Sequence, residues 1–103
     1  MDYQLVLQFR GDDCLDFDAM VSLEDEIQQI AEPIAEVDGH DVGSGEMNIF
    51  ILTADPVAMF ERAKPLLSVA SLLDKVSVAY RELRSDDFRV LWPTSSTGAF
   101  VVA

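Results

Sequence analysis

The run Met47-Asn-Ile-Phe-Ile-Leu-Thr53 constrains the fold of this chain more than any other segment. It is apolar on both parities of a strand, with Ile49 and Ile51 on one face and Phe50 and Leu52 on the other. β-branched and aromatic residues favour strands, and a strand that is apolar on both faces is typical of the middle of a sheet. The sequence therefore predicts a central strand over 47–53.

Alternating strand and helix signals surround this run. Residues 3–10 repeat apolar side chains at every second position, which predicts a half-buried strand. Apolar residues at helical spacing predict a helix from about 19 or 22 to 31, with Ser22 and Asp25 as a capping box and Pro33 as its stop. Residues 34–37 are a short candidate edge strand.

The second half of the chain repeats this alternation. Asp55-Pro56 predicts a helix start, with the aspartate as N-cap and the proline in the first turn. Pro65 predicts a kink, or a second short turn reaching about Leu72. Residues 74–83 and 88–92 alternate again and predict two further strands, joined by the polar turn 84–87.

The order β-α-β-β-α-β with one appended strand predicts an α+β fold, the ferredoxin-like sandwich with an additional C-terminal strand. Two helices then cover one face of an antiparallel sheet. At 103 residues the chain suits one compact domain. We expect a single ferredoxin-like domain over residues 1–93 and a C-terminal tail over residues 94–103.

Charge is distributed unevenly along the chain. Residues 1–50 carry 13 acidic side chains and one basic one, Arg10, whereas residues 51–103 carry six of each, so the formal net charge of -12 arises in the first half. Binding to nucleic acid is disfavoured, because phosphates require lysines and arginines. The asymmetry favours a cationic partner, and the alternative is that acidity only keeps the protein in solution.

The sequence indicates a cytoplasmic setting. Apolar runs such as 49–52 are far shorter than a membrane-spanning helix requires. The first residues lack the basic region and the cleavage site of a secretory signal. Cys14 is the only cysteine, so no internal disulfide is expected.

The predicted topology brings the segments 11–18 (GDDCLDFD) and 38–46 (DGHDVGSGE) to the same end of the sheet, because both follow strands that run in the same direction. Their charged and titratable side chains would form one acidic pole. We expect partner-binding residues here: Asp12, Asp13, Asp16, Asp38, His40, Asp41 and Glu46. Asp18 belongs to the same pole.

The segments 38–51, 55–67 and 87–93 together resemble small bacterial proteins of ferredoxin-like α+β type that mostly lack an assigned function. The quoted runs are DGHDVGSGEMNIFI, Asp55-Pro56 with Phe60 and Lys64-Pro-Leu-Leu67, and DFRVLWP. The resemblance implies the fold and a bacterial cytoplasmic setting, and it carries over no catalytic residue. Some small acidic bacterial proteins act as immunity partners of toxins, which is an analogy of size and charge.

Catalysis and metal binding have weaker support in the sequence. Asp38, His40 and Asp41 are the first candidates for a divalent cation, with Asp12 or Asp13 completing the shell, but their spacing matches no established metal motif. The alternative is a wide glycine turn with an exposed histidine. Cys14 lies among aspartates that disfavour its thiolate. We expect no enzyme activity and no cofactor.

The face of the sheet opposite the helices needs a cover. Val6, Phe50 and Leu52 fall on this face and would form an apolar patch. Two explanations remain open. A second copy would stack on the patch as a homodimer with these residues as its oligomer face, or Phe100–Val102 of the tail would fold back over it.

These observations favour a non-enzymatic cytoplasmic protein that presents its acidic pole to a basic protein partner, without nucleic acid or membrane. The aspartates would steer the partner and accept hydrogen bonds, and His40 would tune the site near neutral pH. The alternative is a metal-dependent enzyme or a small-molecule sensor that uses the segments 11–18 and 38–46. A sensor at the sheet face predicts a pocket near Phe50.

Overall fold

The computed structural model describes residues 1–94 and 100–102. Five strands, two helices and one 3-10 turn follow one another along this part of the chain. In order they are β1 (Tyr3–Arg10), η1 (Gly11–Asp13), α1 (Phe17–Ala31), β2 (Ala35–Gly43), β3 (Glu46–Thr53), α2 (Pro56–Val69), β4 (Ser77–Glu82) and β5 (Arg89–Trp92).

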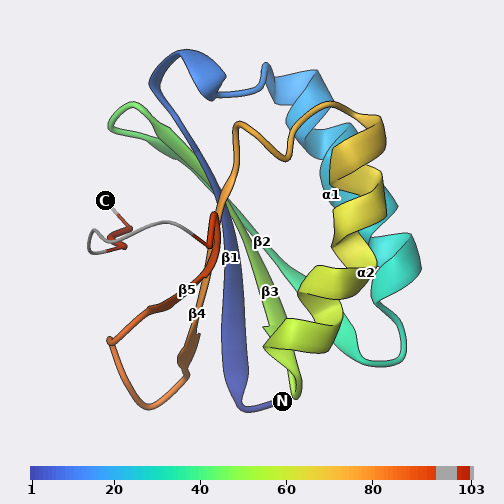
Figure 1. Ribbon diagram of the computed structural model, residues 1–103, viewed down its shortest axis with the longest axis vertical. Helices are drawn as coiled ribbons and strands as arrows, with labels where there is room; N and C mark the ends of the chain where they lie inside the picture. Colours follow the sequence, from blue (N-terminus) through green and yellow to red (C-terminus); the bar gives the residue numbers. More distant parts are fainter. Residues whose placement is uncertain (95–99, 103) are drawn as a thin grey trace.

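The strands form one sheet in the order β2-β3-β1-β4-β5, in which every neighbouring pair is antiparallel. Both helices pack on the same face of this sheet (Figure 1), as the sequence predicts. Each helix connects two strands that run in the same direction and have a third strand between them. Consequently β1 and β2 end at the same edge of the molecule.

The core lies between the helices and one face of the sheet. β1 and β3 contribute one side chain at every second position, since alternate residues of a strand face opposite ways. The completely buried members of this layer are Leu5, Leu7, Phe9, Ile49, Ile51, Val78, Met20, Ile27, Ala31, Met59, Ala63 and Leu67. Burial of a large aliphatic or aromatic side chain stabilises the fold by roughly 1.5–3 kcal/mol.

Both helices begin with an aspartate cap. The Asp55 carboxylate accepts a hydrogen bond of 3.0 Å from the Ala58 amide, as predicted for α2. The predicted end of α1 at residue 31 is confirmed, but its predicted start and capping box were wrong. The helix begins at Phe17, and the Asp16 carboxylate accepts a hydrogen bond of 2.8 Å from the Ala19 amide. An aspartate cap satisfies backbone N–H groups that have no partner inside the helix.

α2 continues through Pro65 as one helix to Val69, and the predicted second turn is absent from this described segment. Beyond it, the Leu72 amide donates to the Leu67 carbonyl at 2.8 Å and closes the helix end. The indole of Trp92 on β5 donates a hydrogen bond of 2.7 Å to the Leu73 carbonyl. This bond ties the edge strand to the segment that follows α2.

β2 is longer than the sequence predicts. The glycine-rich segment 38–46 is not a wide loop, because β2 extends to Gly43 and joins β3 through the two-residue turn Ser44-Gly45. Both turn residues have positive φ, 54° and 75°. Positive φ at both central residues is typical of the type I′ turn, whose twist matches that of antiparallel strands. A register shift between Val37 and Gly39 leaves Asp38 at a bulge.

Within the described residues, neither helix is both long enough and apolar enough to cross a membrane. The longer of the two is α1, with 15 residues.

Candidate functional site

The end of β1 and the β2–β3 turn lie against each other, which places η1 and this turn at one end of the sheet. Asp41 pairs with Asn48 near that end, whereas Asp38 lies at the bulge next to Gly39, whose partner Phe50 pairs with Val6 in the middle of β1. The Gly11 amide donates a hydrogen bond of 2.9 Å to the Gly45 carbonyl. Nearby, the Cys14 thiol lies 3.3 Å from the Phe9 carbonyl oxygen. Figure 1 shows η1 and the β2–β3 hairpin at the same end of the sheet.

Exposed carboxylates follow these segments from η1 through the start of α1 and along β2. We call them the acidic surface, and they are Asp12, Asp13, Asp16, Asp18, Asp38 and Asp41. Within the described residues none of them makes an ion pair, since the ion pairs there involve Glu46, Glu24 and Glu61. Asp16 also caps α1. The surface therefore carries uncompensated negative charge toward the solvent.

His40 and Asp41 lie on β2 and face opposite sides of the sheet. His40 pairs in register with Ile49 of the core layer, whereas Asp41 pairs with Asn48 of the opposite face. The His40 Nδ1 atom lies 3.1 Å from a carboxylate oxygen of Glu24 on α1. The imidazole also meets the ring of Phe17 edge to face, with centroids 5.9 Å apart. His40 thus contacts α1 and does not share a site with Asp41.

The side chains around Asp38 and His40 on β2 do not form a set of metal ligands. Among residues 1–94 and 100–102, no three His, Cys, Asp or Glu side chains are grouped closely enough to hold a metal ion. Asp38, His40 and Asp41 were the first candidates. The strand separates His40 from Asp41, because consecutive side chains of an extended chain alternate between faces, and Asp38 lies at the bulge of β2.

Glu46 was expected among the partner-binding residues of the acidic pole, but its side chain is buried. It is 4% exposed and lies opposite Arg10 in the register of β1 and β3. One carboxylate oxygen lies 3.3 Å from the Arg10 Nη2 atom, and the other accepts from the amides of Gln8 at 3.3 Å and Asn48 at 3.1 Å. A buried charge requires such partners, because its desolvation is costly.

These four residues, Gln8, Arg10, Glu46 and Asn48, form a polar network on the sheet face opposite the helices. Gln8 also donates a hydrogen bond of 2.9 Å to the Asn48 side chain and another of 2.9 Å to the carbonyl oxygen of Val101. No buried side-chain nitrogen or oxygen of the described residues lacks a hydrogen bond. The network links β1 and β3 to the C-terminal residues.

The apolar patch expected on this face is mostly covered. Val6 is completely buried, so it is not available as part of an exposed oligomer face, while Phe50 and Leu52 are partly buried. Residues 100–102 lie on the side of the sheet opposite the helices (Figure 1). They line a groove of about 510 Å³ together with Phe50, and the Phe100 ring packs on Phe88 with centroids 5.0 Å apart. Most of the predicted C-terminal tail, residues 95–99 and 103, lies outside the described residues.

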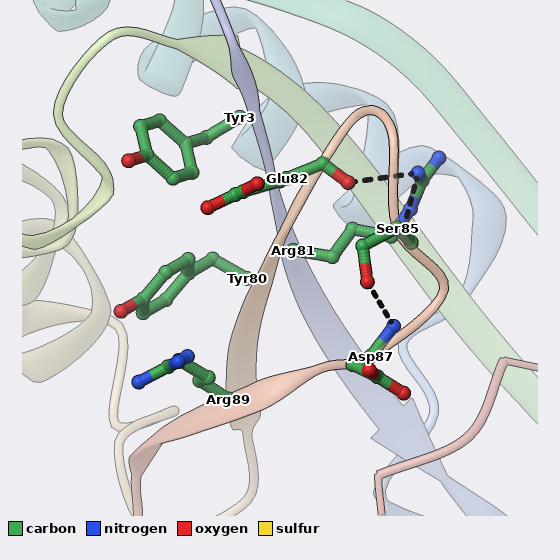
Figure 2. Close-up of a pocket in the computed structure, with 7 residues that line it drawn as sticks. All are labelled: Tyr3, Tyr80, Arg81, Glu82, Ser85, Asp87 and Arg89. Carbon is green, nitrogen blue, oxygen red and sulfur yellow. Dashed lines mark hydrogen bonds between the residues drawn. The ribbon is translucent and has the colours of Figure 1, made fainter.

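A second groove, of about 400 Å³, lies at the far end of β1, β4 and β5. In Figure 2 the side chains of Tyr3, Tyr80, Glu82 and Arg89 point in one direction from the sheet, and the rings of Tyr3 and Tyr80 meet edge to face at 5.8 Å. Arg81 points the other way and donates to carbonyl oxygens of the β4–β5 turn, Ser85 among them at 3.1 Å. The guanidinium of Arg81 thus holds the turn.

Sequence reasoning missed this groove. The alternation over 3–10 and 74–83 predicts strands but not their pairing. The cross-strand pairs Tyr3–Glu82 and Tyr80–Arg89 appear only once the register of β1, β4 and β5 is known. Two phenol hydroxyls, two carboxylates (Glu82 and Asp87) and two guanidinium groups (Arg81 and Arg89) are among the groups that line the groove, so its formal charge cancels. Comparisons of this chain with protein-family models, with curated proteins and with solved structures each gave no match.

Proposed function

We propose that this chain is a non-enzymatic protein-binding module whose acidic surface receives a basic protein partner. The observation that carries the proposal is the acidic surface itself. Its six carboxylates come from η1, α1 and β2, they are exposed, and none makes an ion pair within the described residues. Unpaired like charges destabilise a fold through repulsion unless a counter-charge meets them.

The role of these charges is to attract and orient. Interactions between exposed charges act over a Debye length of about 8 Å at physiological ionic strength, so the surface accelerates encounter with a cationic protein. Once the partner is bound, the carboxylates of Asp12, Asp13, Asp38 and Asp41 accept charge-assisted hydrogen bonds from lysine or arginine. The affinity should therefore fall as salt is added.

The ferredoxin-like class and the cytoplasmic setting belong to this proposal. The sheet order β2-β3-β1-β4, with two helices on one face, supports the class. The single thiol of Cys14, which has no second cysteine to pair with, supports a reducing compartment. An immunity-like role, in which the module neutralises a basic toxin, fits the same charge distribution.

The test is an affinity capture from host lysate with three folded baits. One is the wild type, and one carries D12N, D13N, D38N and D41N. The third is a matched control that carries D74N, E82Q, D86N and D87N, which are exposed acids outside the acidic surface. Each of the four changes in a variant removes one negative charge, so the two variants have the same net charge.

We expect a basic protein that the wild type and the control retain and the first variant loses. Purified, that protein should bind with an affinity that decreases with ionic strength. Equal loss in both variants would mean that net charge alone governs binding, and equal retention in all three would mean that the acidity serves solubility. Either result contradicts the proposal.

A second candidate function is supported by the groove beside Phe50. Its lining combines apolar rings with the polar side chains of Gln4, Arg81 and Asp86, a mixture typical of small-molecule sites. A naphthalene-sulfonate dye is a suitable probe. Binding to the wild type that Phe50→Ser abolishes in a folded variant would support this function, and dye binding unchanged by the substitution would contradict it.

A further inference from the structure

β2 forms one edge of the sheet, and the second half of this edge is open. In an antiparallel pair, residues alternate between those whose backbone bonds the partner strand and those whose N–H and C=O groups face away. The two-residue turn makes Gly43 and Glu46 a hydrogen-bonded pair. By alternation, the backbone groups of His40 and Val42 face away from β3.

The first half of the same edge is already occupied. The Val37 amide donates a hydrogen bond of 3.0 Å to the side-chain oxygen of Gln28 on α1. The bulge at Asp38 then separates this covered part from the rest of the strand. The segment 40–43 is exposed throughout. Backbone groups of an open edge are a template for another strand.

We propose that the segment Gly39–Gly43 of β2 receives an extended, basic segment of the partner as an added strand. The inference rests on the proposed function and specifies how the partner binds. Main-chain hydrogen bonds to His40 and Val42 would supply affinity, and the carboxylates of Asp38 and Asp41 beside them would select lysine or arginine side chains.

Charge also decides between a partner and a second copy of this chain. Two copies joined edge to edge at β2 would bring the same aspartates, Asp38 and Asp41, close to each other. Like charges on paired strands are destabilising, and such repulsion is a common means of excluding the wrong partner. The acidic edge therefore disfavours self-association and favours a cationic strand.

The probe for the test is the synthetic peptide Lys-Thr-Lys-Val-Lys-Thr-Lys with blocked termini. Its control has the same sequence with N-methyl groups on alternate amides, which keeps the charge and removes the donors along one edge. The readout is amide hydrogen exchange of His40 and Val42 by NMR, together with the affinity of each peptide for the wild type and for D38N/D41N.

We expect the unmethylated peptide to slow exchange at His40 and Val42 and to bind about tenfold more tightly than its methylated control, which corresponds to about 1.4 kcal/mol. Val42→Pro, which removes one outward amide from an edge position where proline is tolerated, should lower the affinity similarly. The exchange measurement needs no variant, so it remains decisive even where Val42→Pro destabilises the fold.

The two proposals fail differently. One outcome is that both peptides bind equally, that amide exchange does not change, and that D38N/D41N weakens the binding. This outcome would overturn strand addition and leave the acidic surface as a binding site. Peptide binding that does not depend on Asp38 and Asp41 would overturn the selection of a basic strand by these aspartates, and no binding at low salt would overturn strand addition. Either result would remove support from the proposed function as well.

Discussion

Two glycines at the β2–β3 turn, Gly43 and Gly45, allow a matched test. Substitution by alanine adds a Cβ atom at either position, but we expect opposite effects on stability. A Cβ placed on Gly45 or on Gly43 meets no atom within 4 Å, so neither substitution by alanine creates a clash. Gly45 has a φ of +75°, whereas Gly43 is not in the left-handed region. Any difference between Gly45→Ala and Gly43→Ala therefore reports backbone conformation alone.

The expected magnitudes follow from that geometry. An L-residue in the left-handed region costs roughly 1–2 kcal/mol, so Gly45→Ala should lower the free energy of unfolding by about this amount. At Gly43, in an extended conformation, alanine reduces the entropy of the unfolded chain and should raise stability by about 0.4–1 kcal/mol. With a urea m-value of about 1–3 kcal/mol per molar, the two denaturation midpoints should differ by roughly 1 M.

Urea denaturation followed by far-ultraviolet circular dichroism measures both midpoints, with unchanged slopes as the check that only stability has changed. Equal shifts for Gly45→Ala and Gly43→Ala, or a more stable Gly45→Ala, would refute the assignment of a positive-φ turn at Ser44-Gly45. The turn fixes the register of β2 on β3, so the same result would also remove the geometric basis for the open edge.

Three further predictions concern stability. Asp16→Ala should cost about 1 kcal/mol through loss of the α1 cap while Asp16→Asn should cost much less, which thermal unfolding will show. Ile49→Ala should cost about 2–5 kcal/mol because Ile49 is 0% exposed, whereas Val69→Ala, at a residue 88% exposed, should change the free energy of unfolding by less than about 0.5 kcal/mol in urea. Trp92→Phe keeps the ring packing but leaves the Leu73 carbonyl without its donor, and chemical denaturation should show a loss of about 1–3 kcal/mol.

Strong local patterns made part of the fold predictable. The alternation in β1, the apolar run of β3 and the Asp55-Pro56 start of α2 each have a single reasonable interpretation, and they suffice to predict two helices on one face of an antiparallel sheet. The predicted start of α1, at about residue 19 or 22, is too late, because Ser22 and Asp25 have the pattern of a capping box although Asp16 is also a good cap residue. Burial of Met20 in the core favours a helix that begins at the earlier cap, Asp16.

β2 was not predictable from local pattern. Aspartate and glycine are depleted in strands, so the run Asp38-Gly-His-Asp41 indicates a loop. Pairing with β3 overrides that preference. The same limitation applies to the candidate site. Sequence identifies Glu46 as one more carboxylate, but only the register shows that it lies opposite Arg10 and is buried. Exposure of the aspartates in η1 follows from the sequence, and their partner remains a prediction.

The central position of β1 has a consequence for how the chain acquires its structure. Leu5 pairs with Ile51 on one side and with Tyr80 on the other, so both neighbours of β1 come much later in the chain than β1 itself. Closing such long loops costs entropy before any contact repays it, which slows folding. The β2–β3 hairpin, joined by two residues, is the part able to form early. We therefore expect the hairpin to precede the insertion of β1, and β1 to gain its second neighbour only when β4 is available.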